Sequence, residues 1–451
     1  MAGADRPLRR VPARSHSPTI VERWGRYTSA RVESRLPLSG VSVVDLTRNV
    51  AGPWAAMVLA ELGADVVKVE QPRAGDDTRH WGPPFWGGES PVFLALNRNK
   101  RSLTLDLREP EARPVLERLV ASTDVVLESF RPGALERLGY GYAWAAARNA
   151  RIVYCSITSF GERGPLRDRP GYDPLMQACG GIMSVTGEPG RAPVRAGVSL
   201  VDMGTGMWAA LAVMAALLRV RETGRGQRIA SSLYETALVW MCYHLAAYWA
   251  GGDAPGRHGS GTATIAPYEA FAAKDGYLVI AAGNDSLFAR LCDALGHPQW
   301  ICDARFRRNA DRVRHRQALR AEIEAVTRTW TTDRLADRLS ARGLPCSPIR
   351  SVDAVAADPQ ALALGIFQRL SHPAIPDFQS VGLPFLLEGE RPRLRRPPPQ
   401  CGEHNAEILA EMGFSPEEVA QLLTSPAVAG GPPPAEQRHT DARGREPWTS
   451  N

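Results

Sequence analysis

The chain has 451 residues, with 54 Lys and Arg against 48 Asp and Glu, and 44% of its side chains are hydrophobic. This length and composition exclude wholesale disorder and are typical of a globular protein with two or three domains. Almost all of the net charge of +6 comes from residues 1–36, where eight Arg stand against three acidic residues. A basic nucleic-acid-binding face is therefore not expected on the body of the protein.

The ends of the chain differ from its middle. Residues 1–36 are predicted to be a disordered basic arm, with a transit peptide as the alternative, and residues 426–451 are predicted to be a disordered tail rich in Pro, Gly and Ala. The seven cysteines form no Cys-x-x-Cys pair, which favours reduced thiols in the cytoplasm and neither disulfides nor a metal site. No uninterrupted apolar run reaches the ~18–20 residues of a membrane span, so we expect no membrane partner.

Strand and helix patterns alternate along the first half of the chain. Buried strands are predicted over residues 41–47, 65–70, 102–107, 124–128 and 151–157, and helices over residues 54–62 and 111–121. This alternation predicts an α/β fold with a Rossmann-like, doubly wound parallel sheet that has helices on both faces.

The pattern of predicted helices and strands changes in the second half of the chain. Long helices are predicted over residues 202–221 and 232–250, separated by a glycine-rich turn at residues 223–227. A hairpin over residues 267–282 and helices at 286–295, 317–330 and 333–341 follow. We therefore divide the chain into a large domain whose first part is residues 37–225, a connecting helix and linker at 226–259, a smaller α+β domain at 260–345, and a return to the large domain at 346–425.

The turn after the first strand does not fit a dinucleotide-binding fingerprint. It reads Arg48-Asn49-Val50-Ala51-Gly52-Pro53, with one glycine where the G-x-G-x-x-G pattern needs three. P-loop, H-E-x-x-H and G-x-S-x-G sequences are absent as well. A nicotinamide dehydrogenase, a zinc protease and a serine hydrolase of that type are therefore disfavoured.

Several segments together carry a family resemblance. They read LSGV at 38–41, DLT at 45–47, AGP at 51–53, LGADVVKVE at 62–70, GDDTR at 75–79, NRNKRS at 97–102, DVVLESFRPG at 124–133, GYD at 171–173, VDMGTG at 201–206 and TGRGQ at 223–227. In order and spacing, over residues 38–420, the chain resembles the class III CoA-transferases, the family of formyl-CoA transferase, carnitine CoA-transferase and alpha-methylacyl-CoA racemase. The resemblance implies an acyl-CoA and a small carboxylic acid as substrates, no permanently bound cofactor or metal, and an interlocked homodimer.

The resemblance assigns the nucleophile to Asp202. A carboxylate there would attack the acyl-CoA thioester and pass through a mixed anhydride to a covalent aspartyl-CoA thioester. The residues alone leave a second interpretation open, in which Asp202 caps the apolar helix that follows, since Asp is a favoured N-cap residue.

Tyr172 separates two activities within the family. The racemases carry His in a Gly-His-Asp segment, where this chain reads Gly171-Tyr172-Asp173. A Tyr with a pKa of about 10 is a poor base beside a His of about 6.5, which disfavours the racemase alternative. Asp173 either orients the site or caps residues 174–179, and a non-catalytic acyl-CoA-binding protein is a further alternative.

The CoA-binding residues follow from the resemblance alone. They are Val50, Ala51, Leu105, Arg108, Ser129, Phe130, Arg131 and Arg137. Formyl-CoA transferase has Gln where this chain has Val50, which disfavours oxalate or formate chemistry. The segment GRHGSG at 256–261 resembles the mobile glycine loop of the family, with an inter-domain linker as the alternative.

Overall fold

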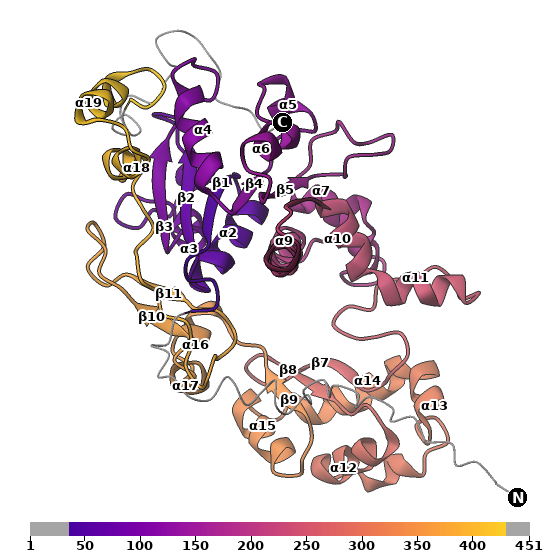
Figure 1. Ribbon diagram of the computed structural model, residues 1–451. Helices are drawn as coiled ribbons and strands as arrows, with labels where there is room; N and C mark the ends of the chain where they lie inside the picture. The colour runs from indigo at the N-terminus through magenta and orange to yellow at the C-terminus, as the bar shows by residue number, and fades with distance from the viewer. Residues whose placement is uncertain (1–35, 430–451) are drawn as a thin grey trace, which may run out of the picture.

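The computed structural model describes residues 36–429, so the predicted basic arm and the tail beyond residue 429 lie outside the described part. Figure 1 shows a large α/β domain and, beside it, a smaller domain formed by the middle of the chain. The chain leaves the large domain after α11 and returns through α16 and α17, so two separate segments join the domains.

The large domain is built on one six-stranded parallel sheet, as the alternating pattern predicted. Its strands are β1 (Ser42–Leu46), β2 (Asp65–Glu70), β3 (Lys100–Thr104), β4 (Val125–Glu128), β5 (Val153–Thr158) and β6 (Gln227–Ser232). They lie in the order β3-β2-β1-β4-β5-β6. The direction of winding reverses between β1 and β4, which is the point where open α/β sheets bind their ligands.

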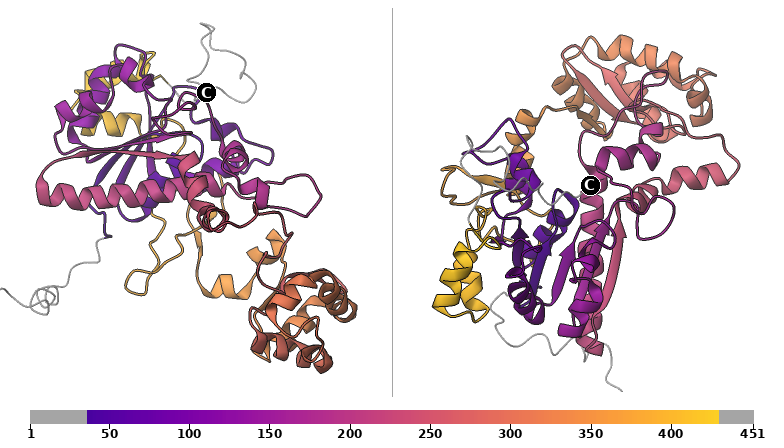
Figure 2. Two further views of the ribbon diagram at one scale, coloured as in Figure 1. Left: turned by 90° about the vertical axis from the view of Figure 1, so that its right-hand side faces the viewer. Right: turned by 90° about the horizontal axis from the view of Figure 1, so that it is seen from above.

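Helices cover both faces of this sheet because its strands are apolar on both sides (Figure 2). Val43 and Val66 pack with α2 (Ala51–Glu61) and α9 (Leu200–Thr223) on one face. The next residue along each strand, Val44 and Val67, packs on the other face with α4 (Ala112–Ser122) and α6 (Tyr142–Arg148). Shorter helices complete the domain: η2 (Asp77–His80), α3 (Pro91–Leu96), α5 (Ala134–Arg137), α7 (Asp173–Cys179) and α8 (Ile182–Val185).

The region after the first long helix departs from the sequence prediction. Residues 227–232, which the prediction placed in the connecting segment and not in the sheet, form β6 beside β5. The predicted helix over 232–250 is two helices, α10 (Leu233–Trp240) and α11 (Cys242–Trp249), separated at Met241. By length and composition α9 could cross a membrane, but half of its most apolar window is buried inside the structure, as in a core helix.

The small domain has a core of its own. The predicted hairpin is β7 (Tyr268–Ala272) and β8 (Tyr277–Ala281), and β9 (Cys346–Pro348) pairs with β8 just past the predicted boundary at residue 345. Around this sheet lie α12 (Asp285–Leu295), η3 (Pro298–Ile301), α13 (Asn309–Arg314), α14 (Arg316–Thr327) and α15 (Thr332–Ser340).

The last part of the described chain returns to the large domain, where its C-terminal segment covers the β3 edge of the sheet. It contains α16 (Val352–Ala356), α17 (Pro359–Ala363), β10 (Phe367–Arg369), β11 (Gln379–Val381), α18 (Asn405–Glu411) and α19 (Pro416–Thr424). The Thr104 N–H donates to Asn405 Oδ1 at 2.9 Å, and the Asp106 N–H donates to the Ala427 carbonyl at 2.8 Å. Ala427 and Val428 are fully buried, so the predicted start of the tail at residue 426 is too early.

Candidate active site

One cavity lies at the carboxyl ends of β1, β4 and β5, at the reversal of the sheet order. Its lining comes mainly from the turn after β1, the loops after β4 and β5, and the start of α9, with Trp81 after η2 and Leu233 at the start of α10. The lining residues are Arg48, Asn49, Val50, Ala51, Gly52, Trp81, Ser129, Phe130, Arg131, Pro132, Ile157, Thr158, Ser159, Arg167, Arg169, Pro170, Gly171, Tyr172, Asp202 and Leu233. Loops from several strands thus converge on one side chain of α9, Asp202.

Asp202 lies in the first turn of α9, which begins at Leu200. One turn further along, Gly206 packs so closely on α2 that a Cβ atom there would lie 2.4 Å from the Ala51 carbonyl oxygen. Only glycine permits this approach without a shift of one helix. The contact therefore fixes the carboxyl of Asp202 beside the β1–α2 turn.

Asp173 accepts hydrogen bonds from the first turn of α9. Its carboxylate is 2% exposed, and its Oδ2 accepts the Val201 N–H at 2.8 Å and the Asp202 N–H at 3.2 Å. Gln177 donates to its other oxygen. Asp173, from α7, thus caps α9. The alternatives in which Asp202 caps α9 and Asp173 caps α7 are both wrong, since Asp202 lies inside the helix and Asp173 bonds elsewhere.

The environment of Asp202 disfavours its charge. Burial, together with the nearby negative charge of Asp173, raises the pKa of Asp202 to about 7. An ionised carboxylate at this position is poorly solvated and has its lone pairs free for attack.

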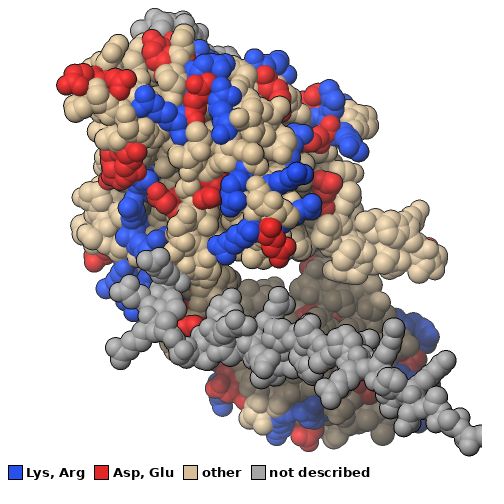
Figure 3. Space-filling model, viewed as in Figure 1, with Lys and Arg blue, Asp and Glu red and all other residues tan. Residues whose placement is uncertain are grey.

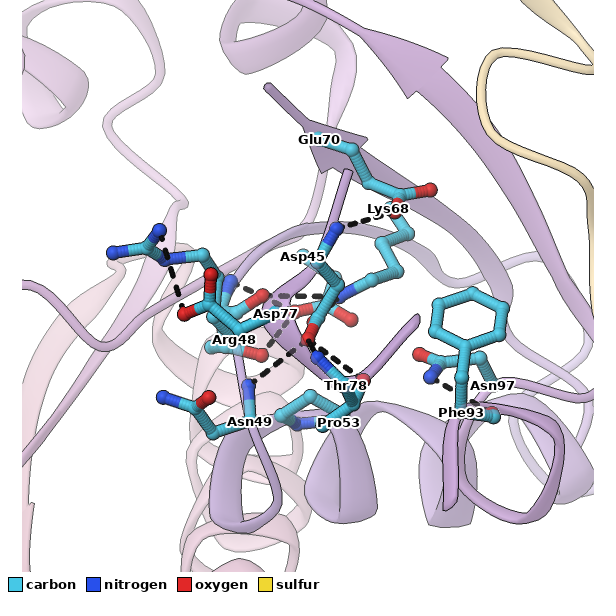
Figure 4. A network of polar contacts seen from close by, with 12 residues as sticks. Asp45, Arg48, Asn49, Pro53, Lys68, Glu70, Asp77, Thr78, Phe93 and Asn97 are labelled. Atoms are coloured by element: carbon cyan, nitrogen blue, oxygen red, sulfur yellow. Dashed lines mark hydrogen bonds and ion pairs between the residues drawn. The ribbon is translucent and has the colours of Figure 1, made fainter. Parts of the chain in front are cut away.

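A buried ion network lies behind the cavity and holds the β1–α2 turn (Figure 4). Lys100 Nζ donates to Asp45 Oδ2 at 2.9 Å, and Lys68 Nζ lies 2.7 Å from Asp76 Oδ2. All four side chains are fully buried. Burial lowers the pKa of Lys100 to about 8 although Asp45 opposes that shift.

The same network reaches the backbone of the turn. Lys68 Nζ donates to the Thr47 carbonyl at 3.0 Å, and Lys100 Nζ donates to the Pro53 carbonyl at 3.0 Å. The Asn49 N–H, at a left-handed φ of 66°, donates to Asp76 Oδ1 at 3.3 Å. The sequence analysis did not predict this network. The chain has only three lysines, Lys68, Lys100 and Lys274, and this rarity could have drawn attention to the two in the network.

The cavity brings most of the predicted site residues together. Those that line it are Val50, Ala51, Ser129, Phe130, Arg131, Tyr172 and Asp202. Leu105 is buried in the core, Arg108 pairs with Asp106 at 2.8 Å, and Arg137 lies on α5, so none of these three lines the cavity. The glycine segment 256–261 also lies outside the lining, where the Gly259 N–H donates to the Gly187 carbonyl at 2.9 Å.

The lining residues that were not assigned from the sequence include three arginines and a tryptophan: Arg48, Arg167, Arg169 and Trp81. The position of Arg48 directly after a buried strand was the available signal, because strand ends of a parallel sheet face its ligand crevice. Between residues 36 and 429, no group of three His, Cys, Asp or Glu side chains is arranged to hold a metal ion.

Comparisons with known proteins identify a family. The model of CoA-transferase family III matches residues 38–405. A succinate–glutarate CoA-transferase from Agrobacterium fabrum is 39% identical over 83% of this chain and 96% of its own length. The succinyl-CoA:glutarate CoA-transferase of Homo sapiens is 37% identical over 90% of this chain and 93% of its own length.

A solved structure shares the fold. The crystal structure of a CAIB/BAIF family protein from Brucella suis superposes with a TM-score of 0.77 and is 41% identical. The match covers 84% of this chain and all of the Brucella chain. The similarity therefore includes both domains and is not confined to the parallel sheet.

Proposed function

The chain belongs to CoA-transferase family III and transfers CoA between an acyl-CoA and a carboxylic acid, and we propose that it does so through a covalent aspartyl-CoA thioester on Asp202. Asp202 attacks the thioester carbonyl of the donor and releases CoA thiolate, which leaves a mixed anhydride. The thiolate then attacks the aspartyl carbonyl of that anhydride and releases the donor acid. Each step exchanges one acyl bond for another and needs no redox partner.

The second half of the reaction runs the same steps in reverse. The acceptor carboxylate attacks the aspartyl-CoA thioester, releases the thiolate and forms a new mixed anhydride. The thiolate attacks the acceptor carbonyl of this anhydride, which yields the new acyl-CoA and restores the carboxylate of Asp202. A thiol with a pKa of about 8.5 is a tolerable leaving group for both halves.

One observation carries this proposal: the carboxyl of Asp202 opens into the cavity at the switch point of the sheet while its backbone amide is held by Asp173. The amides of Val201 and Asp202 are occupied by a different carboxylate, so the side chain of Asp202 is not needed as a helix cap. We propose that Asp173 positions Asp202 and that Tyr172, which is 43% exposed, lies over the acyl group.

CoA itself is a substrate, and CoA-transferases of this family use CoA thioesters. We propose that Val50, Ala51, Ser129, Phe130 and Arg131 contact its pantetheine end, since they line the same cavity as Asp202. Leu105, Arg108 and Arg137 lie outside that lining and remain predictions for the nucleotide end. The name of one relative contains succinate and glutarate and that of the other succinyl-CoA and glutarate, and both acids are dicarboxylic.

The interlocked homodimer, a cytoplasmic location and the absence of nucleic-acid and membrane partners remain proposals. Exposed apolar side chains on α9 and α11 support the dimer: Met207, Trp208, Leu211, Tyr243, Tyr248 and Trp249 are each at least 41% exposed. Figure 3 shows the α11 projection as a surface with almost no charged residues. A second copy of the chain would remove this apolar surface from water.

The substitution Asp202→Asn tests the mechanism. The amide keeps the shape of the side chain but cannot form an anhydride, so CoA exchange should fall by several orders of magnitude while acyl-CoA binding persists. The wild-type protein, given donor acyl-CoA without acceptor, should carry a CoA adduct on the peptide containing Asp202, and hydroxylamine should remove it. Mass spectrometry of the digested protein and of the CoA products measures both effects.

Asp337→Asn is the matched control, because Asp337 is an exposed carboxylate of the small domain outside the cavity lining and should leave exchange unchanged. An Asp202→Asn protein that still exchanges CoA at the wild-type rate, with no adduct on that peptide, would contradict the mechanism. Racemisation of a 2-methylacyl-CoA by the wild-type protein would instead support the racemase alternative.

A further inference from the structure

Arg48 is a buried guanidinium whose hydrogen-bonding capacity is not filled by the protein. Its side chain is 8% exposed, and within the described residues its Nη1 has no hydrogen-bond partner. The carboxylate paired with it, Asp77, lies 3.8 Å from Nη1, beyond hydrogen-bond distance. A buried charged donor left without an acceptor is costly, so such a group in a cavity is suited to an anionic ligand.

The backbone that carries Arg48 is held in place by hydrogen bonds. The Arg48 N–H donates to Ser129 Oγ at 3.1 Å, which ties the β1–α2 turn to the loop after β4. The neighbouring residues Thr47 and Asn49 are bound by Lys68 and Asp76 of the buried network. Figure 4 shows Arg48 beside this network, with Asp77 next to its guanidinium. The turn is therefore fixed before any ligand arrives, which reduces the entropy lost on binding.

The location of Arg48 points to the acid and not to the phosphates of CoA. Arg48 is three residues before Ala51, and Ala51 touches Gly206, one helical turn from Asp202. The reacting carbonyl must lie at Asp202. The phosphates of CoA are a full pantetheine arm away from that carbonyl, whereas the far end of a short acid is only a few bonds away.

Apart from Asp202, the other charged side chains of the lining are all arginines: Arg131, Arg167 and Arg169. Arg169 also lines the cavity and forms no ion pair within residues 36–429, and Arg167 pairs with the exposed Asp168 at 3.2 Å. These guanidiniums offset the repulsion that Asp202 and Asp173 would exert on an incoming anion. The cavity is thus suited to an acid that keeps a negative charge after its reacting carboxylate has become an anhydride or a CoA thioester.

We propose that Arg48, assisted by Arg169, binds the second carboxylate of a dicarboxylic acid while the first carboxylate exchanges CoA at Asp202. This assignment rests on the proposed function and adds the residue that selects the substrate class. A guanidinium and a carboxylate can form two parallel, charge-assisted hydrogen bonds. A monocarboxylic acid of the same length has no second carboxylate for Arg48 and cannot form them.

The test compares glutarate with pentanoate as acceptors, both with five carbons, using one acyl-CoA donor at fixed concentration. The wild-type ratio of kcat/KM should favour glutarate by about 30-fold or more, because the loss of one partner from a buried charge pair has an effect of that size. Arg48→Gln should bring the ratio near one, and Arg48→Lys should restore part of it. Arg163→Gln, on an exposed loop outside the cavity lining, is the control and should keep the wild-type ratio.

A second measurement does not depend on turnover. Calorimetric titration of glutarate and pentanoate into the Asp202→Asn protein, with and without Arg48→Gln, reports the anion site when no CoA can be transferred. If glutarate binding requires Arg48 but the Asp202→Asn protein still exchanges CoA and the wild-type protein carries no adduct at Asp202, the anion site stands and the proposed mechanism is rejected. Equal use of the two acids, or an equal loss for both in Arg48→Gln, would overturn the assignment of Arg48.

Discussion

The carboxyl of Asp202 lies in an environment that favours its reaction as a nucleophile but lowers the stability of the fold when the group is ionised. Its pKa of about 7 in the folded chain compares with an ordinary value of 3.8. Below about pH 4 both folded and unfolded states hold the proton, and the folded state has no penalty. As the pH rises to about 7 the unfolded state ionises first, so the folded state loses stability over this range and none further above it.

Asp202→Asn should therefore stabilise the protein at pH 8. We expect a gain of about 1–3 kcal/mol in the free energy of unfolding, discounted from the full shift because the side chain is partly open to the cavity. The gain should shrink as the pH falls from 7 toward 5. Thermal or urea unfolding of both proteins across this range measures it, and a gain that is independent of pH would contradict a penalty from charge.

Asp173 offers a separate test of the same pKa. Asp173→Asn keeps an oxygen that can accept the Val201 and Asp202 amides but removes the charge that raises the pKa of Asp202. Transfer needs ionised Asp202, so the wild-type kcat/KM should rise with pH through about 7, and the midpoint should lie lower in the variant. A pH–rate profile measures this shift, with Asp337→Asn as control. An unchanged midpoint would mean that burial alone sets the pKa.

The family resemblance pointed to Asp202, Tyr172, Val50 and Ser129 because each lies in a segment shared with the family, and all four line the cavity. It did not locate the role of Arg48 or the pairing of Lys100 with Asp45. Asp45 and Lys100 are 55 residues apart, and neither local pattern contains the other. Partners fixed only by tertiary contact are therefore what local sequence reasoning misses.

At the scale of elements, the approach of α9 to α2 determines where Asp202 lies. Gly206→Ala would place a methyl group 2.4 Å from the Ala51 carbonyl oxygen, so the helices must separate. We expect a loss of about 1–3 kcal/mol in stability and a fall in kcat larger than the change in acyl-CoA binding. Gly197→Ala is the control, since a Cβ there meets nothing within 4 Å. Wild-type turnover in Gly206→Ala would contradict this role.

The elements that the sequence predicted well have strong apolar patterns. β2 matches its predicted bounds of 65–70, and α4 and α12 are within one residue at each end of theirs. β6 was missed because Gln227–Ser232 is mostly polar and becomes a strand by pairing with β5. The break between α10 and α11 was missed because no proline or glycine marks Met241. Both features depend on tertiary contacts and not on the local sequence.

At the scale of the molecule, the apolar side chains on α9 and α11 need a partner. Sedimentation should show a dimer that persists at low micromolar concentration, with an interface far above the ~1,600 Å² of a standard complex. Trp249→Glu, on the projecting α11, should weaken or prevent it, whereas Arg225→Glu, on an exposed turn, should not. A wild-type monomer at that concentration would contradict the interlocked architecture.

The cover on β3 has a consequence for biosynthesis. This edge strand leaves the ribosome early, but Asn405, Ala427 and Val428, which bind it, are made about 300 residues later. At about 5–20 residues per second the nascent edge waits roughly 15–60 s for its cover. Unpaired edges attract other chains, so a chain ending at residue 399 should aggregate during expression, whereas one ending at residue 429 should remain in the soluble fraction. The ribosome therefore has to synthesise residues 405–428 before the β3 edge of the large sheet is protected.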